Sequence, residues 1–129
     1  MSSSPLQVSA RPLSTEALND LIIDSIQDIK GKNIVKLDLR KLPDAPTDFF
    51  IICEGDSNVQ VKSIADNIHR RLKTEGGSAP LHTEGQQQAS WVCMDCFTTV
   101  VHIFYRETRK YYDLEDLWSD AKVTEYDNL

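Results

Sequence analysis

Apolar residues recur with a helical period in two segments of the chain. In residues 15–30 they fall on one face at spacings of three and four, with Ser14 and Gly31 suited to the two ends. Residues 57–75 repeat this pattern, and Ser57 and Gln60 have the spacing of a capping box. The sequence therefore predicts two amphipathic helices, each with one face turned to a core.

Shorter apolar runs predict the strands. Residues 48–54 are apolar almost throughout, which is typical of a strand covered on both faces. Residues 34–39 suit another strand, 91–96 and 99–105 suit a hairpin, and 80–83 suit a short edge strand. Asp113 is expected to cap a last short helix. The order predicts an α/β fold: a mixed β-sheet of about five strands with flanking helices.

The 129 residues fit one domain, which we place at 14–121 between a flexible leader, 1–13, and an acidic tail, 122–129. No apolar run reaches the roughly 20 residues of a membrane span, and no secretory signal is visible, so a cytoplasmic protein without membrane contact is expected. The net charge of −6 argues against a protein that grips a nucleic-acid backbone. The acidic tail suits either simple solvation or a basic partner.

Cys93 and Cys96 have a spacing found in zinc and redox motifs. In a strand, however, positions three apart point to opposite faces, and zinc also needs about four ligands. A redox pair would sit at a helix start. With Cys53 the chain has three cysteines, an odd count that suggests reduced thiols. We therefore expect Cys93 and Cys96 to be small apolar side chains of a strand, and we expect no metal or cofactor.

Three further features resemble enzyme chemistry but have simpler explanations. The turn at Gly55, Asp56 and Ser57 precedes a helix, as in phosphate sites, but Asp56 places a negative charge there. A nucleotidyltransferase needs paired carboxylates for metal ions, and the strand after the second helix offers only Asp95. His102 is a lone histidine among apolar residues, which favours packing over catalysis. We expect no enzymatic activity, with a nucleotidyltransferase-like enzyme as the alternative.

One face of the strand 91–96 combines a large aromatic residue with a carboxylate. Trp91, Cys93 and Asp95 share this face, whereas the other face is uniformly apolar and suits a core. Tryptophan and tyrosine often anchor protein interfaces, although they are also common in cores. Arg109, Tyr111 and Tyr112 form a nearby aromatic-basic element, which likewise suits either a protein interface or a core.

Long collinear motifs resemble the ribosomal silencing factor family, also called the Iojap family, from Leu18 to Ala121. They are DFFIICEGDSNVQVKSIADNI, HTEG, WVCMD and VVHIFYRETRKYYDLEDLW. The resemblance implies a nucleotidyltransferase-like fold without transferase activity or cofactor. It also implies binding to the large ribosomal subunit through its fourteenth protein, which blocks joining of the small subunit and represses translation when nutrients are short. A homodimer is a further possibility, and no sequence readout of nucleic acid is expected.

The residues expected to contact the ribosomal protein lie on the hairpin and after it: Trp91, Asp95, Glu84, Met94, Arg109 and Tyr111. Trp91 is expected to supply the buried anchor of this contact, so that its loss would abolish binding and leave the fold intact. Two positions depart from the family pattern. Asp56 replaces a threonine, and Cys96-Phe97-Thr98 replaces the usual hairpin turn, so a contact made by this turn is expected to differ in detail from the family pattern.

Overall fold

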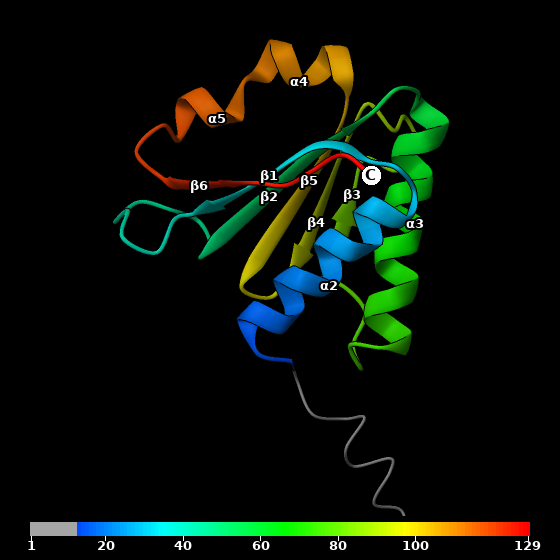
Figure 1. Ribbon diagram of the computed structural model, residues 1–129, viewed down its shortest axis with the longest axis horizontal. Helices are drawn as coiled ribbons and strands as arrows, with labels where there is room; N and C mark the ends of the chain where they lie inside the picture. Colours follow the sequence, from blue (N-terminus) through cyan, green and yellow to red (C-terminus); the bar gives the residue numbers. More distant parts are fainter. Residues whose placement is uncertain (1–12) are drawn as a thin grey trace, which may run out of the picture.

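A computed structural model describes residues 13–129, so the expected leader lies, except for Leu13, outside the described residues. The helices are α2 (Thr15–Asp28), α3 (Asn58–Thr74), α4 (Arg106–Tyr112) and α5 (Leu114–Leu117). The strands are β1 (Lys32–Asp38), β2 (Phe49–Gly55), β3 (His82–Glu84), β4 (Trp91–Cys96), β5 (Thr99–Tyr105) and β6 (Lys122–Glu125). Together they confirm the predicted mixed α/β fold (Figure 1).

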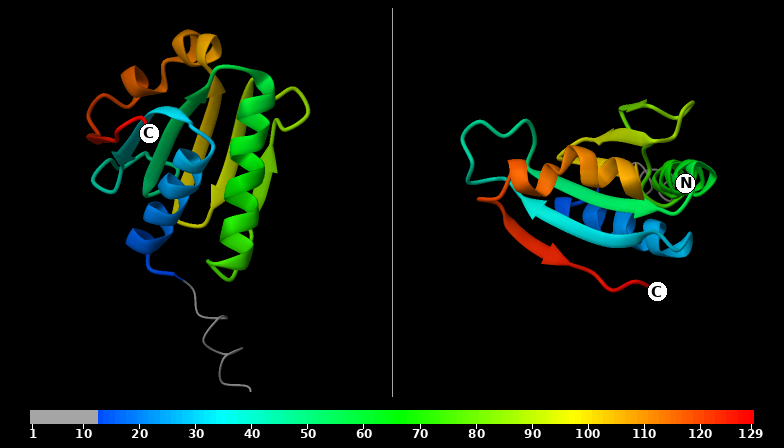
Figure 2. Two further views of the ribbon diagram at one scale, coloured as in Figure 1. Left: turned by 45° about the vertical axis from the view of Figure 1, so that its right-hand side comes forward. Right: turned by 90° about the horizontal axis from the view of Figure 1, so that it is seen from above.

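The sheet has six strands in the order β3-β4-β5-β2-β1-β6. Only β2 and β5 pair in parallel, and the other neighbours are antiparallel. α2 and α3 lie side by side across one face of the sheet (Figure 2). The short helices α4 and α5 follow the end of β5, and Leu114 and Trp118 pack on the opposite face. β2 is therefore covered on both faces, as its apolar run predicts.

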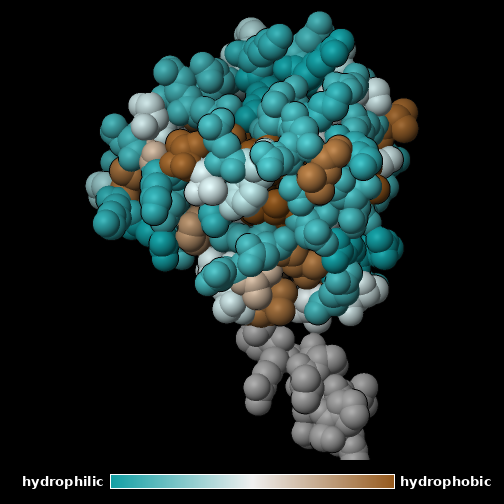
Figure 3. All heavy atoms as spheres, in the orientation of Figure 1, coloured by the Kyte–Doolittle hydropathy of each residue, from teal (hydrophilic) through white to brown (hydrophobic). Residues whose placement is uncertain are grey.

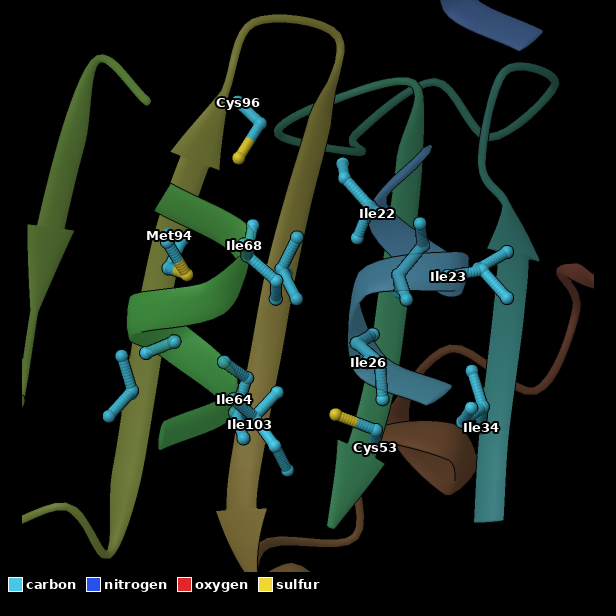
Figure 4. Packing of buried hydrophobic residues seen from close by; sticks show 14 of the residues in the cluster. Ile22, Ile23, Ile26, Ile34, Cys53, Ile64, Ile68, Met94, Cys96 and Ile103 are labelled. Atoms are coloured by element: carbon cyan, nitrogen blue, oxygen red, sulfur yellow. The ribbon is translucent and has the colours of Figure 1, made fainter. Parts of the chain in front are cut away.

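Local signals placed the two long helices correctly. The Ser14 hydroxyl accepts the Ala17 N–H at 3.1 Å, and the Ser57 hydroxyl accepts the Gln60 N–H at 3.1 Å, so both predicted N-caps are present. The apolar faces of α2 and α3 meet the sheet in one core, and Figure 4 shows residues of both helices packed against residues of β1, β2, β4 and β5. The face seen in Figure 3 is mostly hydrophilic, with hydrophobic residues scattered across it.

Two elements differ from expectation. The segment expected to be an acidic tail contains β6, which pairs with β1 and makes six strands rather than about five. All four side chains of β6 are exposed, so this strand has no buried apolar face that could appear as a pattern in the sequence. α4 was also not predicted, because its sequence RETRKYY has no apolar stripe. Asp113 does precede the last helix, but its side chain makes no capping hydrogen bond and its φ is 47°.

Candidate functional site

The side chains of β4 alternate between two faces, as the sequence predicts. Trp91, Cys93 and Asp95 are half-buried, and the residues between them are buried. Met94 is 1% exposed and lies near Ile68 of α3 in the core (Figure 4). Because α3 covers this side of β4, a partner at the sheet surface does not reach Met94. The prediction that Met94 contacts the ribosomal protein is therefore wrong.

Strand pairing adds two residues of β3 to the exposed side of β4. His82 lies opposite Asp95, and Glu84 lies opposite Cys93. Residues directly opposite each other in antiparallel strands point to the same face. The surface formed by these five side chains is called the outer face: His82, Glu84, Trp91, Cys93 and Asp95. It points away from α2 and α3, and the Glu84 side chain is 72% exposed.

Two carboxylates give the outer face its charge. Glu84 and Asp95 stand on adjacent strands, and His82 Nε2 lies 3.0 Å from Glu84 Oε1. The residues directly opposite Asp95 on its two neighbouring strands are His82 and Val100. Neither is a carboxylate, so no carboxylate lies directly opposite Asp95.

Trp91 has a structural role as well as an exposed edge. Its indole Nε1–H donates to His102 Nδ1 at 3.1 Å. Its ring centroid lies 5.0 Å from that of Phe104 and 4.6 Å from that of Tyr112. Truncation of Trp91 would therefore remove packing inside the domain, and loss of binding in such a variant would not by itself identify a contact. Charged residues of the outer face are better probes.

His102 is a buried, neutral residue beneath the outer face. Because Nδ1 accepts the indole proton, the ring proton of the neutral imidazole is on Nε2, which has no hydrogen-bond partner among the described residues. Aromatic rings of Phe50, Trp91 and Phe104 surround it. Burial lowers the pKa of His102 from 6.5 to about 4. His102 therefore packs, as the sequence suggests.

This burial predicts an acid-sensitive stability. The unfolded chain takes up a proton at His102 near pH 6.5, but the folded chain does so only near pH 4. The free energy of unfolding should therefore fall by up to about 3 kcal/mol between pH 6.5 and 4 through His102 alone. In urea titrations at several pH values, His102→Phe should lose this component and His69→Gln, at an exposed position, should keep it. An unchanged pH slope in His102→Phe would contradict the assignment.

Arg109 is buried, so its expected role as a contact residue needs correction. Its Nη1 donates to the Asn33 carbonyl at 2.6 Å and to Glu54 Oε1 at 3.1 Å. Its Nε and Nη2 donate to Glu115 Oε2 at 3.2 Å and 3.0 Å. The guanidinium thus ties α4 to β1, β2 and α5 and holds the two short helices on the sheet. Tyr111, two residues further along α4, is 81% exposed and stays available to a partner.

The turn between β2 and α3 is occupied by side chains of the protein itself. Asp56 lies 2.9 Å from Lys32 Nζ and 3.9 Å from Arg106 Nη1, and the Lys32 ammonium lowers the pKa of Asp56. The Asp56 N–H donates to Gln60 Oε1 at 2.7 Å. The Asp56 carboxylate and a backbone N–H that is already hydrogen-bonded thus occupy the position that a phosphate would need. This agrees with the expectation that the turn is not a phosphate site.

The Cys-x-x-Cys residues lie on opposite faces of β4, as predicted: Cys93 is half-buried outside and Cys96 is buried inside. Burial raises the pKa of both thiols, that of Cys96 to about 12, so both are protonated at neutral pH. Within residues 13–129, no three His, Cys, Asp or Glu side chains come close enough to hold a metal ion. No helix in the described part of the chain is long and apolar enough to cross a membrane.

Sequence reasoning missed His82 as a member of the outer face. The period-two pattern of residues 82–84, paired with the strand 91–96, was a usable signal, but register is not visible in one sequence. The burial of Arg109 had no comparable signal, because its partners lie far apart along the chain.

Fold and site together define a small mixed α/β domain whose sheet leaves an acidic face open on one side. A family model described as "Ribosomal silencing factor during starvation" matches residues 12–129. The chain belongs to this ribosomal silencing factor family, whose members are named for silencing the ribosome and so for regulating translation.

Individual members of this family are similar to the chain over most of its length. A ribosomal silencing factor of Halalkalibacterium halodurans is 35% identical over 117 residues, which cover 91% of this chain and 98% of that protein. One from Chromobacterium violaceum is 38% identical over 113 residues, covering 85% and 88%. A crystal structure of a Chromobacterium violaceum protein superposes with a TM-score of 0.78 at 37% identity, covering 83% of this chain and 88% of that one.

Proposed function

We propose that this protein binds the large ribosomal subunit through its fourteenth protein and thereby prevents the small subunit from joining. Family membership supports a ribosomal partner. The observation that carries the proposal is the outer face, where Glu84 and Asp95 stand on a regular sheet that α2 and α3 leave uncovered. Fixed carboxylates on a rigid surface favour a basic ribosomal protein, because charge complementarity guides encounter and register.

Repression by occupancy needs contact area rather than catalytic groups. A standard interface takes about 800 Å² of each partner's surface, which a domain of 14.6 kDa can supply. The cytoplasm, where translating ribosomes are found, is the proposed place of action. We infer a regulatory rather than an enzymatic role, because Asp95 has no carboxylate opposite it on either neighbouring strand.

Subunit joining tests this proposal directly. Purified protein is added to separated large and small subunits, and the joined ribosomes are measured on a sucrose gradient. We expect fewer joined ribosomes as the protein concentration rises, with the protein migrating with the large subunit. Unchanged joining at concentrations that saturate the large subunit would contradict steric repression. Magnesium-dependent nucleotidyl transfer that is lost in Asp95→Asn would instead favour the enzyme.

A further inference from the structure

A row of aromatic rings leads from the core to the surface of α4. Phe104 is fully buried and packs on Trp91, and Trp91 packs on Tyr112. Tyr112 in turn meets Tyr111 edge-on, with ring centroids 5.1 Å apart. Tyr111 is the exposed end of this row, so its ring contributes little buried area to the fold. Tyrosine combines an apolar ring with a polar hydroxyl, so an exposed tyrosine ring is available to a partner.

Tyr111 borders a shallow hollow of about 400 Å³ between Ser90, which precedes β4, the end of β5 and α4. Its lining combines three phenol rings, two hydroxyl side chains and one carboxylate: Tyr105, Tyr111, Tyr112, Ser90, Thr108 and Glu107. Glu107 and Tyr111 are four residues apart on α4 and therefore lie on one side of it. Arg106, the first residue of α4, approaches Asp56 instead, with 3.9 Å between Arg106 Nη1 and Asp56 Oδ1.

We propose that this hollow receives a lysine or arginine side chain of the partner that binds the outer face. An ammonium or guanidinium group is attracted to the faces of tyrosine rings, and a carboxylate at the rim adds an ion pair. The same carboxylate would repel an RNA phosphate. The chemistry of the lining thus favours a basic protein segment over a nucleic acid.

The position of the hollow supports a single partner for both surfaces. Trp91 belongs to the outer face and also contacts Tyr112, which lines the hollow. A segment lying across the outer face can therefore continue over Trp91 and place a basic side chain beside Tyr111. This inference rests on the proposed function, because it specifies one contact of the same interface.

Affinity for purified large subunits, measured by co-sedimentation with the full chain, tests the inference. Tyr111→Ala should weaken binding about tenfold, as for a tyrosine that contacts a cation in a desolvated interface. Tyr111→Phe should bind nearly as well as the original protein, because the ring rather than the hydroxyl meets the cation. Glu107→Gln should weaken binding several-fold. Val123→Ala is the matched control, since Val123 is exposed on β6, at the opposite edge of the sheet from β3 and β4.

Comparison with a variant of the outer face separates failure of the inference from failure of the function. If Asp95→Lys loses binding and Tyr111→Ala does not, the hollow has no such role and the proposed function stands. If neither variant loses binding, the inference is wrong and the outer face lies outside the interface as well. The proposed function itself fails only if the original protein does not migrate with the large subunit. In an independent measurement, acetyl-arginine amide or adenosine monophosphate is titrated into the full chain while the NMR resonances of the Tyr111 ring are followed. Shifts with the arginine probe support the inference, and shifts with the nucleotide alone overturn it in favour of base stacking.

Discussion

Replacing Arg109 with methionine should lower the free energy of unfolding by about 3 kcal/mol. Methionine keeps an apolar stem of similar length but removes the charge that joins Glu54, Glu115 and the Asn33 carbonyl. Removing one partner of a buried ion pair leaves the other charge desolvated and uncompensated. The Arg109 side chain is only 9% exposed, but that of Glu115 is 33% exposed, so we expect the lower end of the usual range.

Urea denaturation of the variant and of Arg106→Met measures this effect. Arg106 is the matched control, because it lies on the same helix, is 54% exposed and approaches Asp56 only at 3.9 Å. Its replacement should change stability by less than about 0.5 kcal/mol. Adding Glu54→Gln to Arg109→Met should restore part of the loss, since one uncompensated charge is removed. A loss below about 1 kcal/mol in Arg109→Met would show that the guanidinium does not hold α4 and α5 in place.

Replacing Asp95 with lysine should weaken binding to the large subunit about hundredfold and leave stability nearly unchanged. Asp95 projects from the outer face, so the longer side chain can extend into solvent. Against a basic partner, the change removes an attraction and introduces a like-charge contact, which costs several kcal/mol when desolvated. The same variant should no longer reduce subunit joining on a gradient.

The control for Asp95→Lys is Asp20→Lys, which makes the same charge change at an exposed position of α2, on the other side of the sheet. Both variants alter the net charge equally, so a difference between them isolates position from overall charge. Equal binding by both variants would remove the outer face from the interface. A large drop in thermal stability of Asp95→Lys would show instead that the residue has a structural role.

Local sequence signals correctly predicted the elements that carry them. The two long helices have side-chain caps and an apolar face, and the hairpin was placed at its observed bounds. The alternation in β4 also assigns Trp91 and Asp95 to one face without reference to the pairing of the strands. Such signals work because a cap or a periodic face is decided by residues within a few positions of each other.

Arg109 shows where local signals end. Its charge, beside aromatic residues, resembles an interface residue in the sequence, but its partners at 33, 54 and 115 come together only when the sheet and α4 are assembled. The bond between Trp91 and His102 depends likewise on the register of β4 and β5. Met94 differs from these cases, because the alternation in β4 already places it on the apolar face that suits a core, and α3 covers it there.

The sequence by itself determined the α/β class, the two helices, the hairpin and the face that carries Trp91 and Asp95, because hydrophobic period and caps are local properties. The tertiary structure alone decided that Lys122–Glu125 is a strand, since its exposed side chains carry no pattern and its backbone hydrogen bonds come from β1. It also decided that Arg109 is internal and that Tyr111 is external. These outcomes depend on contacts between residues distant in the chain, whose geometry a local pattern does not contain.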